Sequence, residues 1–189
     1  MRPKKIMIFA VGRLNPPTAG HELLIEKVRD IASGENAPFM IIPTKSFDAE
    51  KNPVPFDEKI KFIRAGLPVG VEASNIETDP KITNPFTAIE TLFLEYDKLV
   101  MVVGSDRVAW FEKFMFPFMK KEFPDKELVI SSAGHRDPDA DGVAGLSGSK
   151  MRAAASANDF LTFKLGCMTN LSARDCQSLF NTTREGLAI

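Results

Sequence analysis

A turn rich in glycine and proline lies between the first apolar run of the chain and a helical pattern. The segment GRLNPPTAGHELLI begins at Gly12 and contains one of the two histidines. Gly12 lets a ligand approach the backbone, and Gly20, beside the helix start, exposes N–H groups that favour an anion. Thr18 and His21 can donate to a phosphate, and Arg13 adds a fixed positive charge. These residues predict a phosphate site; the alternative is a proline-broken turn with a capping threonine.

A second segment, GLSGSKMRAA, offers similar chemistry further along the chain. Ser147, Gly148 and Ser149 precede a helix that carries Arg152. Small hydroxyl residues at a helix start provide N–H and O–H donors together. Arg152 lies three residues after Ser149, on the same side of the first turn, so both side chains can hold one anion. The alternative is a serine N-cap followed by an arginine that faces solvent.

Apolar runs alternate with helical patterns along most of the chain. Strands are expected at 5–11, 39–42, 75–78, 99–103 and 128–130. Helices are expected at about 19–31, 56–65, from 85 onward, and at 106–116, where Pro117 should break or kink the last one. In the first helix the expected apolar face is Leu23, Leu24, Val28 and Ile31. This order predicts an α/β fold, a Rossmann-like parallel sheet with helices on both faces and a small C-terminal helical tail.

The expected sheet determines where a ligand would bind. Ligands of parallel sheets lie at the carboxyl ends of the strands, near the switch in strand order. We therefore expect the loops 12–21, 43–52 and 104–107 to lie together as a candidate site. A fourth candidate loop, 145–152, can join them only through the way the chain folds. Further candidate residues in and after these loops are Asn15, Lys45, Asn52, Gly104, Asp106 and Trp110.

Three of these residues have competing interpretations. Lys45 either orients an attacking phosphate or is a solvated loop lysine. Asp106 either contacts a base or ribose edge or caps its helix. Trp110 either contacts the acceptor or packs in the core with its apolar helical neighbours.

Composition limits the partners and the cellular environment. The 189 residues carry a net charge of −1, which gives no reason to expect a nucleic-acid or membrane partner. The first apolar run is too short for a signal peptide, and no run approaches transmembrane length. Cys167 and Cys176 match no metal spacing and favour a reduced compartment. We therefore expect a cytoplasmic protein and leave homo-oligomerisation open.

The two anion-binding segments together resemble the nucleotidylyltransferase superfamily. TAGH, residues 18–21, resembles the (H/T)xGH signature, and GRLNPPTAGH is similar to the GRFxPxHxGH form of nicotinamide-nucleotide adenylyltransferases and their cytidylyltransferase-like relatives. LSGSKMR, residues 146–152, resembles the ISSTxxR signature, with Gly148 replacing a serine and Ser149 a threonine. KNPVPFDEKIKFI and VVGSDRVAWF extend the resemblance over most of residues 5–155. The remaining tail resembles only small phage-type members.

The resemblance implies a nucleotidyltransferase domain over 1–155, with a helical extension over 156–189 packed on it. A phosphate-bearing acceptor attacks the α-phosphorus of a nucleoside triphosphate, and pyrophosphate leaves. Mg²⁺ is carried by the triphosphate and needs few protein ligands. Adenylyl transfer to a nucleotide such as nicotinamide mononucleotide is favoured. The alternatives are cytidylyl transfer to a small phosphate ester, and an inactive nucleotide-binding or structural protein.

The resemblance also assigns roles to the candidate residues. The catalytic residues are expected to be His21, Thr18 and Arg152, which contact the triphosphate. The nucleotide-binding residues are expected to be Gly12, Arg13, Asn15, Gly20, Gly104, Asp106, Ser147, Gly148 and Ser149. The acceptor-binding residues are expected to be Lys45, Asn52 and Trp110.

Overall fold

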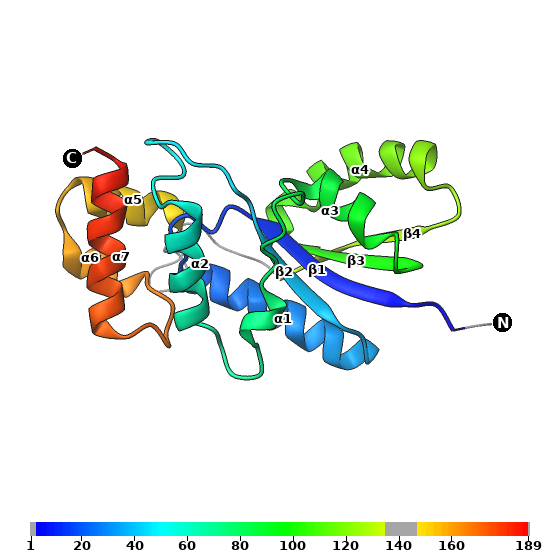
Figure 1. Cartoon of the computed structure of the whole chain (residues 1–189), viewed down its shortest axis with the longest axis horizontal. Helices are drawn as coiled ribbons and strands as arrows, with labels where there is room; N and C mark the ends of the chain where they lie inside the picture. Colours follow the sequence, from blue (N-terminus) through cyan, green and yellow to red (C-terminus); the bar gives the residue numbers. More distant parts are fainter. Residues whose placement is uncertain (1–2, 135–146, 189) are drawn as a thin grey trace. The chain divides into compact units, whose positions relative to one another are not determined.

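The computed structural model describes residues 3–134 and 147–188. Within these residues lies a parallel sheet of four strands in the order β2-β1-β3-β4 (Figure 1). The strands are β1 (Ile6–Gly12), β2 (Phe39–Pro43), β3 (Lys98–Val103) and β4 (Glu127–Ser132). The strands expected at 5–11, 39–42, 99–103 and 128–130 are thereby confirmed, as is the Rossmann-like α/β fold.

Seven α-helices occur in the described part of the chain, together with two short 3-10 turns. They are α1 (Ala19–Glu35), α2 (Phe56–Ala65), α3 (Pro85–Leu92), α4 (Val108–Glu122), α5 (Gly148–Ser156), α6 (Phe160–Leu165) and α7 (Ala173–Gly186). The 3-10 turns are η1 (Ala73–Asn75) and η2 (Ser105–Arg107). The tail helices are confirmed: Gly166 ends α6, and the Ser172 side chain caps α7 by accepting from the N–H of Asp175.

The sheet buries both of its faces, and this explains its continuous apolar strands. Met7 and Phe9 of β1 belong to a core cluster that includes residues of α3 and α4. Ile8 and Ala10 alternate with them, point to the opposite face and are also buried. Figure 1 shows α1 on that opposite face.

Two expectations for individual elements differ from the structure. Helix α4 continues past Pro117 to Glu122, so the expected end at 116 is wrong, whereas a kink at Pro117 stays a prediction. The proline is exposed, so water can bind the Lys113 carbonyl group that lost its helical N–H partner. The strand expected at 75–78 is not formed, and η1 ends at Asn75. The Asn75 side chain accepts from the N–H of Glu72, and this hydrogen bond turns the chain.

The buried face of α1 also differs from the expected one. Ile25, Val28 and Ala32 are buried, whereas Leu23 is exposed. These three positions follow an i, i+3, i+7 pattern, so they form one stripe along the helix. Glu22 lies three residues before Ile25 on the same stripe and is buried with it.

The described residues form two compact units. The first comprises 3–12, 24–44 and 77–134 and contains the sheet, α3 and α4. The second comprises 13–23, 45–76 and 147–188 and contains α2, α5, α6 and α7. In the second unit Phe160 and Phe163 of α6 lie edge-on to Phe180 of α7, with ring centroids 5.3 and 5.2 Å apart.

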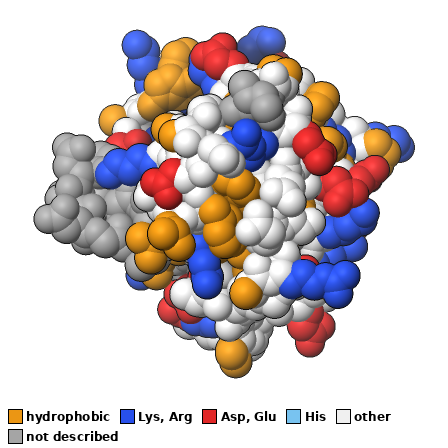
Figure 2. Space-filling view, turned by 90° about the vertical axis from the view of Figure 1, so that its left-hand side faces the viewer, with side chains coloured by type: hydrophobic (Ala, Val, Ile, Leu, Met, Phe, Trp, Pro, Cys, Tyr) orange, Lys and Arg blue, Asp and Glu red, His pale blue; other side chains and the backbone are white. Residues whose placement is uncertain are grey.

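Charged side chains of both signs are mixed on the surface. Figure 2 shows basic and acidic groups interspersed on the face that it presents. Large exposed apolar side chains of the described residues include Val69, Leu94 and Leu161. None of the described helices combines the length and the apolar composition that a membrane crossing requires.

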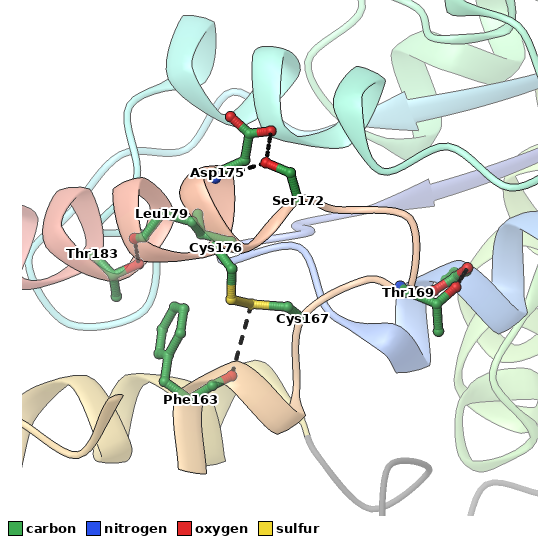
Figure 3. Close-up of a disulfide and its surroundings, with 9 residues drawn as sticks. Phe163, Cys167, Thr169, Ser172, Asp175, Cys176, Leu179 and Thr183 are labelled. Carbon is green, nitrogen blue, oxygen red and sulfur yellow. Dashed lines mark hydrogen bonds between the residues drawn. A yellow bond between two sulfur atoms is a disulfide. The ribbon is translucent and has the colours of Figure 1, made fainter. Parts of the chain in front are cut away.

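The two cysteines form a disulfide, which the sequence analysis did not predict when it took them to favour a reduced compartment. Cys167 follows α6 and Cys176 lies in the first turns of α7 (Figure 3). Their Cα atoms are 6.4 Å apart, within the range that a disulfide spans. The sequence spacing of nine residues gave no sign of this proximity, because it arises from the turn between α6 and α7.

Two glycines in helices provide a matched test of packing. A Cβ atom on Gly186 would lie 1.8 Å from the carbonyl oxygen of Pro53, whereas one on Gly34 would meet nothing within 4 Å. We expect Gly186→Ala to destabilise the protein by about 1–3 kcal/mol through overpacking. Gly34→Ala should stabilise it by about 0.5–1 kcal/mol, because alanine favours the helix. Urea unfolding would measure both, and equal stabilities would contradict the close approach of α7 to Pro53.

Candidate functional site

Two strand ends of the first unit lie at the same edge of the sheet. β1 pairs with β3 so that Phe9 lies opposite Met101, and continuing this register places Gly12 opposite Gly104. The strand order reverses between these two strands, since β2 lies on the other side of β1. The predicted loops after β1 and β3 therefore begin at the switch point of the sheet, where such folds bind ligands.

The loop after β3 keeps Asp106 close to Gly104. A Cβ atom on Gly104 would lie 2.7 Å from Oδ1 of Asp106, so a larger residue here would require the exposed Asp106 carboxylate to turn away. Asp106 makes no side-chain cap hydrogen bond to η2 or α4, and the capping interpretation is therefore wrong. Trp110 is 53% exposed and contacts Phe111 and Phe114, so the interpretation as a core residue is also wrong.

In the second unit, Thr18 and His21 form a closed hydrogen-bonded turn. The N–H of Thr18 donates to Nδ1 of His21 at 3.1 Å, and Thr18 Oγ1 lies 2.9 Å from the same nitrogen. The N–H of His21 donates to the Thr18 carbonyl oxygen at 2.9 Å. Because Nδ1 accepts a backbone N–H, the proton of the neutral ring is on Nε2. This tautomer presents an N–H donor on the side of the ring away from Thr18.

Asn15 links this turn to the loop before α2. Its side chain accepts from the N–H of Val54 at 3.0 Å and donates to the Val54 carbonyl oxygen at 2.8 Å. Asn15 and its neighbour Leu14 are buried, and Leu14 has a φ angle of 45°, which side-chain-bearing residues seldom adopt. The segment between β1 and α1 is thus held in one conformation by its partners.

The two sequence motifs meet at the backbone of Asn15. Nη1 of Arg152 donates to the Asn15 carbonyl oxygen at 2.9 Å, and Nη2 donates to Ser149 Oγ at 3.1 Å. A Cβ atom on Gly148 would lie 3.2 Å from Nη1 and 3.3 Å from that carbonyl oxygen, so glycine makes room for the contact. Burial lowers the pKa of Arg152, and the nearby Arg13 lowers it further.

The helix start at α5 has the expected serine cap. The Ser147 side chain accepts from the N–H of Lys150 at 3.3 Å. Ser147 is thus the N-cap of α5, as the alternative interpretation predicted. The other half of that interpretation, an arginine that faces solvent, is wrong, because Arg152 donates to Asn15. Leu146, the first residue of the second motif, lies outside the described residues.

Two lysines flank one aromatic ring beside the turn. Nζ of Lys45 lies 5.2 Å from the Phe56 ring centroid, and Nζ of Lys59 lies 5.4 Å from it. Lys59 is fully buried and donates to the Arg13 carbonyl oxygen at 2.9 Å. Burial, with a smaller effect from Lys45, lowers the pKa of Lys59 from 10.5 to about 8. Lys59 is thus connected through Arg13 to the segment that leads into the Thr18–His21 turn, which is called the phosphate turn below after its predicted ligand.

A short loop centred on the Asp48 carboxylate holds the Asn52 side chain. Asp48 Oδ1 accepts from the backbone N–H groups of Glu50 and Lys51, and Asp48 also binds the Asn52 side-chain amide. These hydrogen bonds, the one from Lys51 first, lower the pKa of Asp48 to about 2. Asn52 Oδ1 is buried and has no hydrogen-bond partner among the described residues.

The structure brings together most, but not all, of the predicted site residues. One connected part of the second unit holds Arg13, Asn15, Thr18, Gly20, His21, Lys45, Asn52, Ser147, Gly148, Ser149 and Arg152. The first unit holds Gly12, Gly104, Asp106 and Trp110, of which the first three lie at or after the switch-point strand ends. Within residues 3–134 and 147–188, no cluster of three His, Cys, Asp or Glu side chains could hold a metal ion.

Sequence reasoning missed two buried charged residues, although a signal for each existed. Lys59 lies three residues after Phe56 and four before Ile63, so helical spacing places it on the apolar face of α2. Glu22 lies on the buried stripe of α1 for the same reason. A charged residue on an apolar stripe indicates a partner inside the protein.

Comparisons with known proteins include one sequence relative. No protein-family model matches the chain. A protein of Acholeplasma laidlawii, named a probable nicotinate-nucleotide adenylyltransferase, is 26% identical over 106 residues, which are 54% of this chain and 55% of that protein. The chain therefore matches about half the length of this curated relative.

Two solved structures share the fold. A Vibrio parahaemolyticus protein, provisionally assigned as a nicotinate-nucleotide adenylyltransferase, has a TM-score of 0.55 at 15% identity, over 94% of this chain and 99% of that one. Plasmodium falciparum nicotinic acid mononucleotide adenylyltransferase, complexed with APC, has a TM-score of 0.57 at 15% identity, over 94% and 95% of the two chains. At this level of identity, both likenesses show that the chain shares the fold of these two proteins.

The buried Lys59 should make stability depend on pH. The unfolded chain keeps this proton up to about pH 10.5 and the folded chain only to about pH 8. Between these values the unfolded state binds more protons, so the free energy of unfolding rises with pH, by at most about 1.4 kcal/mol per unit. Urea unfolding across this range should show the rise in wild type and lose it in Lys59→Met. The exposed Lys61→Met on the same helix is the control, and an identical rise in both variants would contradict the assignment.

Proposed function

We propose that the protein transfers an adenylyl group from ATP to a pyridine mononucleotide, with nicotinate mononucleotide as the first candidate. The supporting observation is the contact between Arg152 and the Asn15 carbonyl oxygen, which joins the two motifs of the resemblance in one place. The shared name of the sequence relative and of the two structural neighbours supports the choice of acceptor. The APC ligand of one neighbour, an ATP analogue, supports the choice of donor.

The proposed reaction proceeds without a covalent enzyme intermediate. It requires the protein to stabilise negative charge on the phosphate oxygens. A phosphate oxygen of the acceptor forms a bond to the α-phosphorus of ATP, and the bond from that phosphorus to the bridging oxygen of the β-phosphate breaks. Pyrophosphate leaves with the electron pair. The protein lowers the barrier by orienting the two substrates and by stabilising charge on the non-bridging and leaving oxygens.

We assign the triphosphate to the second unit. Nε2–H of His21 donates to the α-phosphate, and Thr18 fixes the ring through its N–H to Nδ1. Arg152 holds the β- and γ-phosphates with the part of its guanidinium not engaged by Asn15. Arg13, Gly20, Ser147, Gly148 and Ser149 line the same phosphates. Mg²⁺ is proposed to arrive with ATP as part of the substrate.

The remaining assignments concern the acceptor and the nucleoside. Lys45 and Asn52 bind the acceptor; the unpartnered Oδ1 of Asn52 supports an acceptor hydroxyl or N–H there. Asp106, beside Gly104, binds the nucleoside of ATP, and the exposed Trp110 offers a face to the acceptor ring. We propose the cytoplasm as the location, with residues 156–189 as an extension packed on a catalytic domain of 1–155.

A pyrophosphate-release screen tests the proposal. ATP and CTP, each with Mg²⁺, would be crossed with nicotinate mononucleotide, nicotinamide mononucleotide and small phosphate esters such as phosphocholine. We expect release only with ATP and a pyridine mononucleotide, and a larger rise in melting temperature with ATP than with CTP. Preference for CTP would indicate the cytidylyltransferase alternative. Binding of ATP without turnover of any acceptor would indicate an inactive nucleotide-binding protein.

His21→Ala should lower kcat by roughly 10²–10³, because it removes a preorganised donor to developing charge. The melting temperature without ligand should change little, since the His21 ring is only partly buried. Lys27→Ala, an exposed change on the same helix, should keep wild-type turnover. Steady-state kinetics of the three proteins would decide, and a near-normal kcat in His21→Ala would remove this residue from the mechanism.

A further inference from the structure

The disulfide closes a loop that carries a partner of the phosphate turn. Figure 3 shows Cys167 and Cys176 joined, with Thr169 on the loop between them. Thr169 lies two residues after Cys167, so the position of one limits the position of the other. The loop is further fixed at Met168, whose side chain is buried close to Gly66.

Two contacts tie this segment to the start of α1. The Gly166 carbonyl oxygen accepts from the N–H of Ala19 at 2.9 Å. The Glu22 carboxylate accepts from the Thr169 N–H at 2.7 Å on one oxygen and from the Thr169 hydroxyl on the other. Ala19 lies two residues before His21, and Glu22 lies directly after it. The two contacts therefore hold the turn that carries the imidazole from both sides.

The burial of Glu22 makes the second contact important. Glu22 is 6% exposed, and a buried carboxylate is costly unless both oxygens are satisfied. Its N–H donates to the Thr18 carbonyl oxygen at 3.0 Å, so the residue belongs to the closed turn. A shift of Thr169 would therefore move the first turn of α1 or leave the carboxylate without partners.

We propose that Glu22 and Thr169 are positioning residues for His21, and that the Cys167–Cys176 disulfide keeps Thr169 in place for this purpose. The effect on turnover rests on the proposed function, whereas the effect on the turn does not. Reduction of the disulfide loosens the loop, weakens the contact with Glu22 and lowers kcat. The disulfide is thus a redox control on the phosphate turn.

The redox step is simple thiol–disulfide exchange. A dithiol reductant transfers two electrons and two protons, the S–S bond breaks, and Cys167 and Cys176 become thiols. The reductant is itself oxidised to a disulfide. Disulfides in a compartment rich in thiol reductants are more often regulatory than structural, which suits a cytoplasmic location.

Kinetics of four proteins, each oxidised and reduced with dithiothreitol, test the proposal. Reduction of wild type should lower kcat by about tenfold and change KM less, because a small displacement of a catalytic group acts on the reacting geometry. Thr169→Val loses the hydroxyl donor and should lower kcat in the oxidised protein to a similar degree. Reduction should then have little additional effect on this variant, because both changes remove the same contact. Cys167→Ser/Cys176→Ser should behave as reduced wild type in both conditions.

Asn170→Ala is the matched control. Its side chain donates to the Leu67 carbonyl oxygen at 2.8 Å and forms no hydrogen bond to α1 within the described residues, so oxidised kcat should stay within about twofold of wild type. If Asn170→Ala lowered kcat as much as Thr169→Val, the loss would be explained by general loosening of the loop, and the proposal of a specific Glu22–Thr169 contact would be wrong. Equal kcat for oxidised and reduced wild type would overturn the redox control.

Amide hydrogen exchange separates this proposal from the proposed function. Reduction should speed exchange of the amides at residues 19–23, where the N–H of Ala19 is bound to Gly166. If no substrate pair turned over but exchange increased on reduction, the proposed function would fail and the positioning contact would stand. Unchanged exchange at these residues would overturn the contact whatever the activity.

Discussion

The hydrogen bond from Arg152 to the Asn15 carbonyl oxygen joins segments 137 residues apart, and the arrangement of the second unit depends on it. The same Asn15 holds Val54 with its side chain, so one residue connects the segment after β1, the loop before α2 and the start of α5. Arginine suits this position because its planar group binds a carbonyl with one nitrogen and Ser149 with the other. The guanidinium is thereby held in one orientation by the protein itself.

Positive charge is concentrated around this connection, and its electrostatic cost is visible. Burial lowers the pKa of both Arg152 and Lys59, and a neighbouring cation lowers each further. The ammonium group of Lys59 donates a hydrogen bond to the Arg13 carbonyl oxygen, which is a weaker partner for a cation than a carboxylate. A site that holds cations close together in this way is stabilised by a bound polyanion, which is what the proposed triphosphate would provide.

The sheet could be predicted from the sequence because its strands are buried on both faces. Continuous apolar runs such as 99–103 have few other interpretations once helices separate them. The turn at Thr18–His21 could also be predicted, since a threonine just before a helix is expected to cap it, and the Thr18 hydroxyl accepts from the N–H of His21 at 3.3 Å. Its internal geometry could not be, because whether Nδ1 of His21 accepts from Thr18 depends on side-chain rotamers rather than spacing. The disulfide and the Glu22–Thr169 contact depend on how separate segments pack together, and local sequence patterns do not predict this packing.

The phosphate turn is made early in synthesis, yet its partners come from late segments. Asn15, Ala19 and Glu22 meet Arg152, Gly166 and Thr169, so the loops that these contacts close are more than a hundred residues long. A ribosome must therefore deliver residue 169 before the turn can acquire all three supports. An incompletely made chain would hold the residues of this turn without the contacts that fix their conformation.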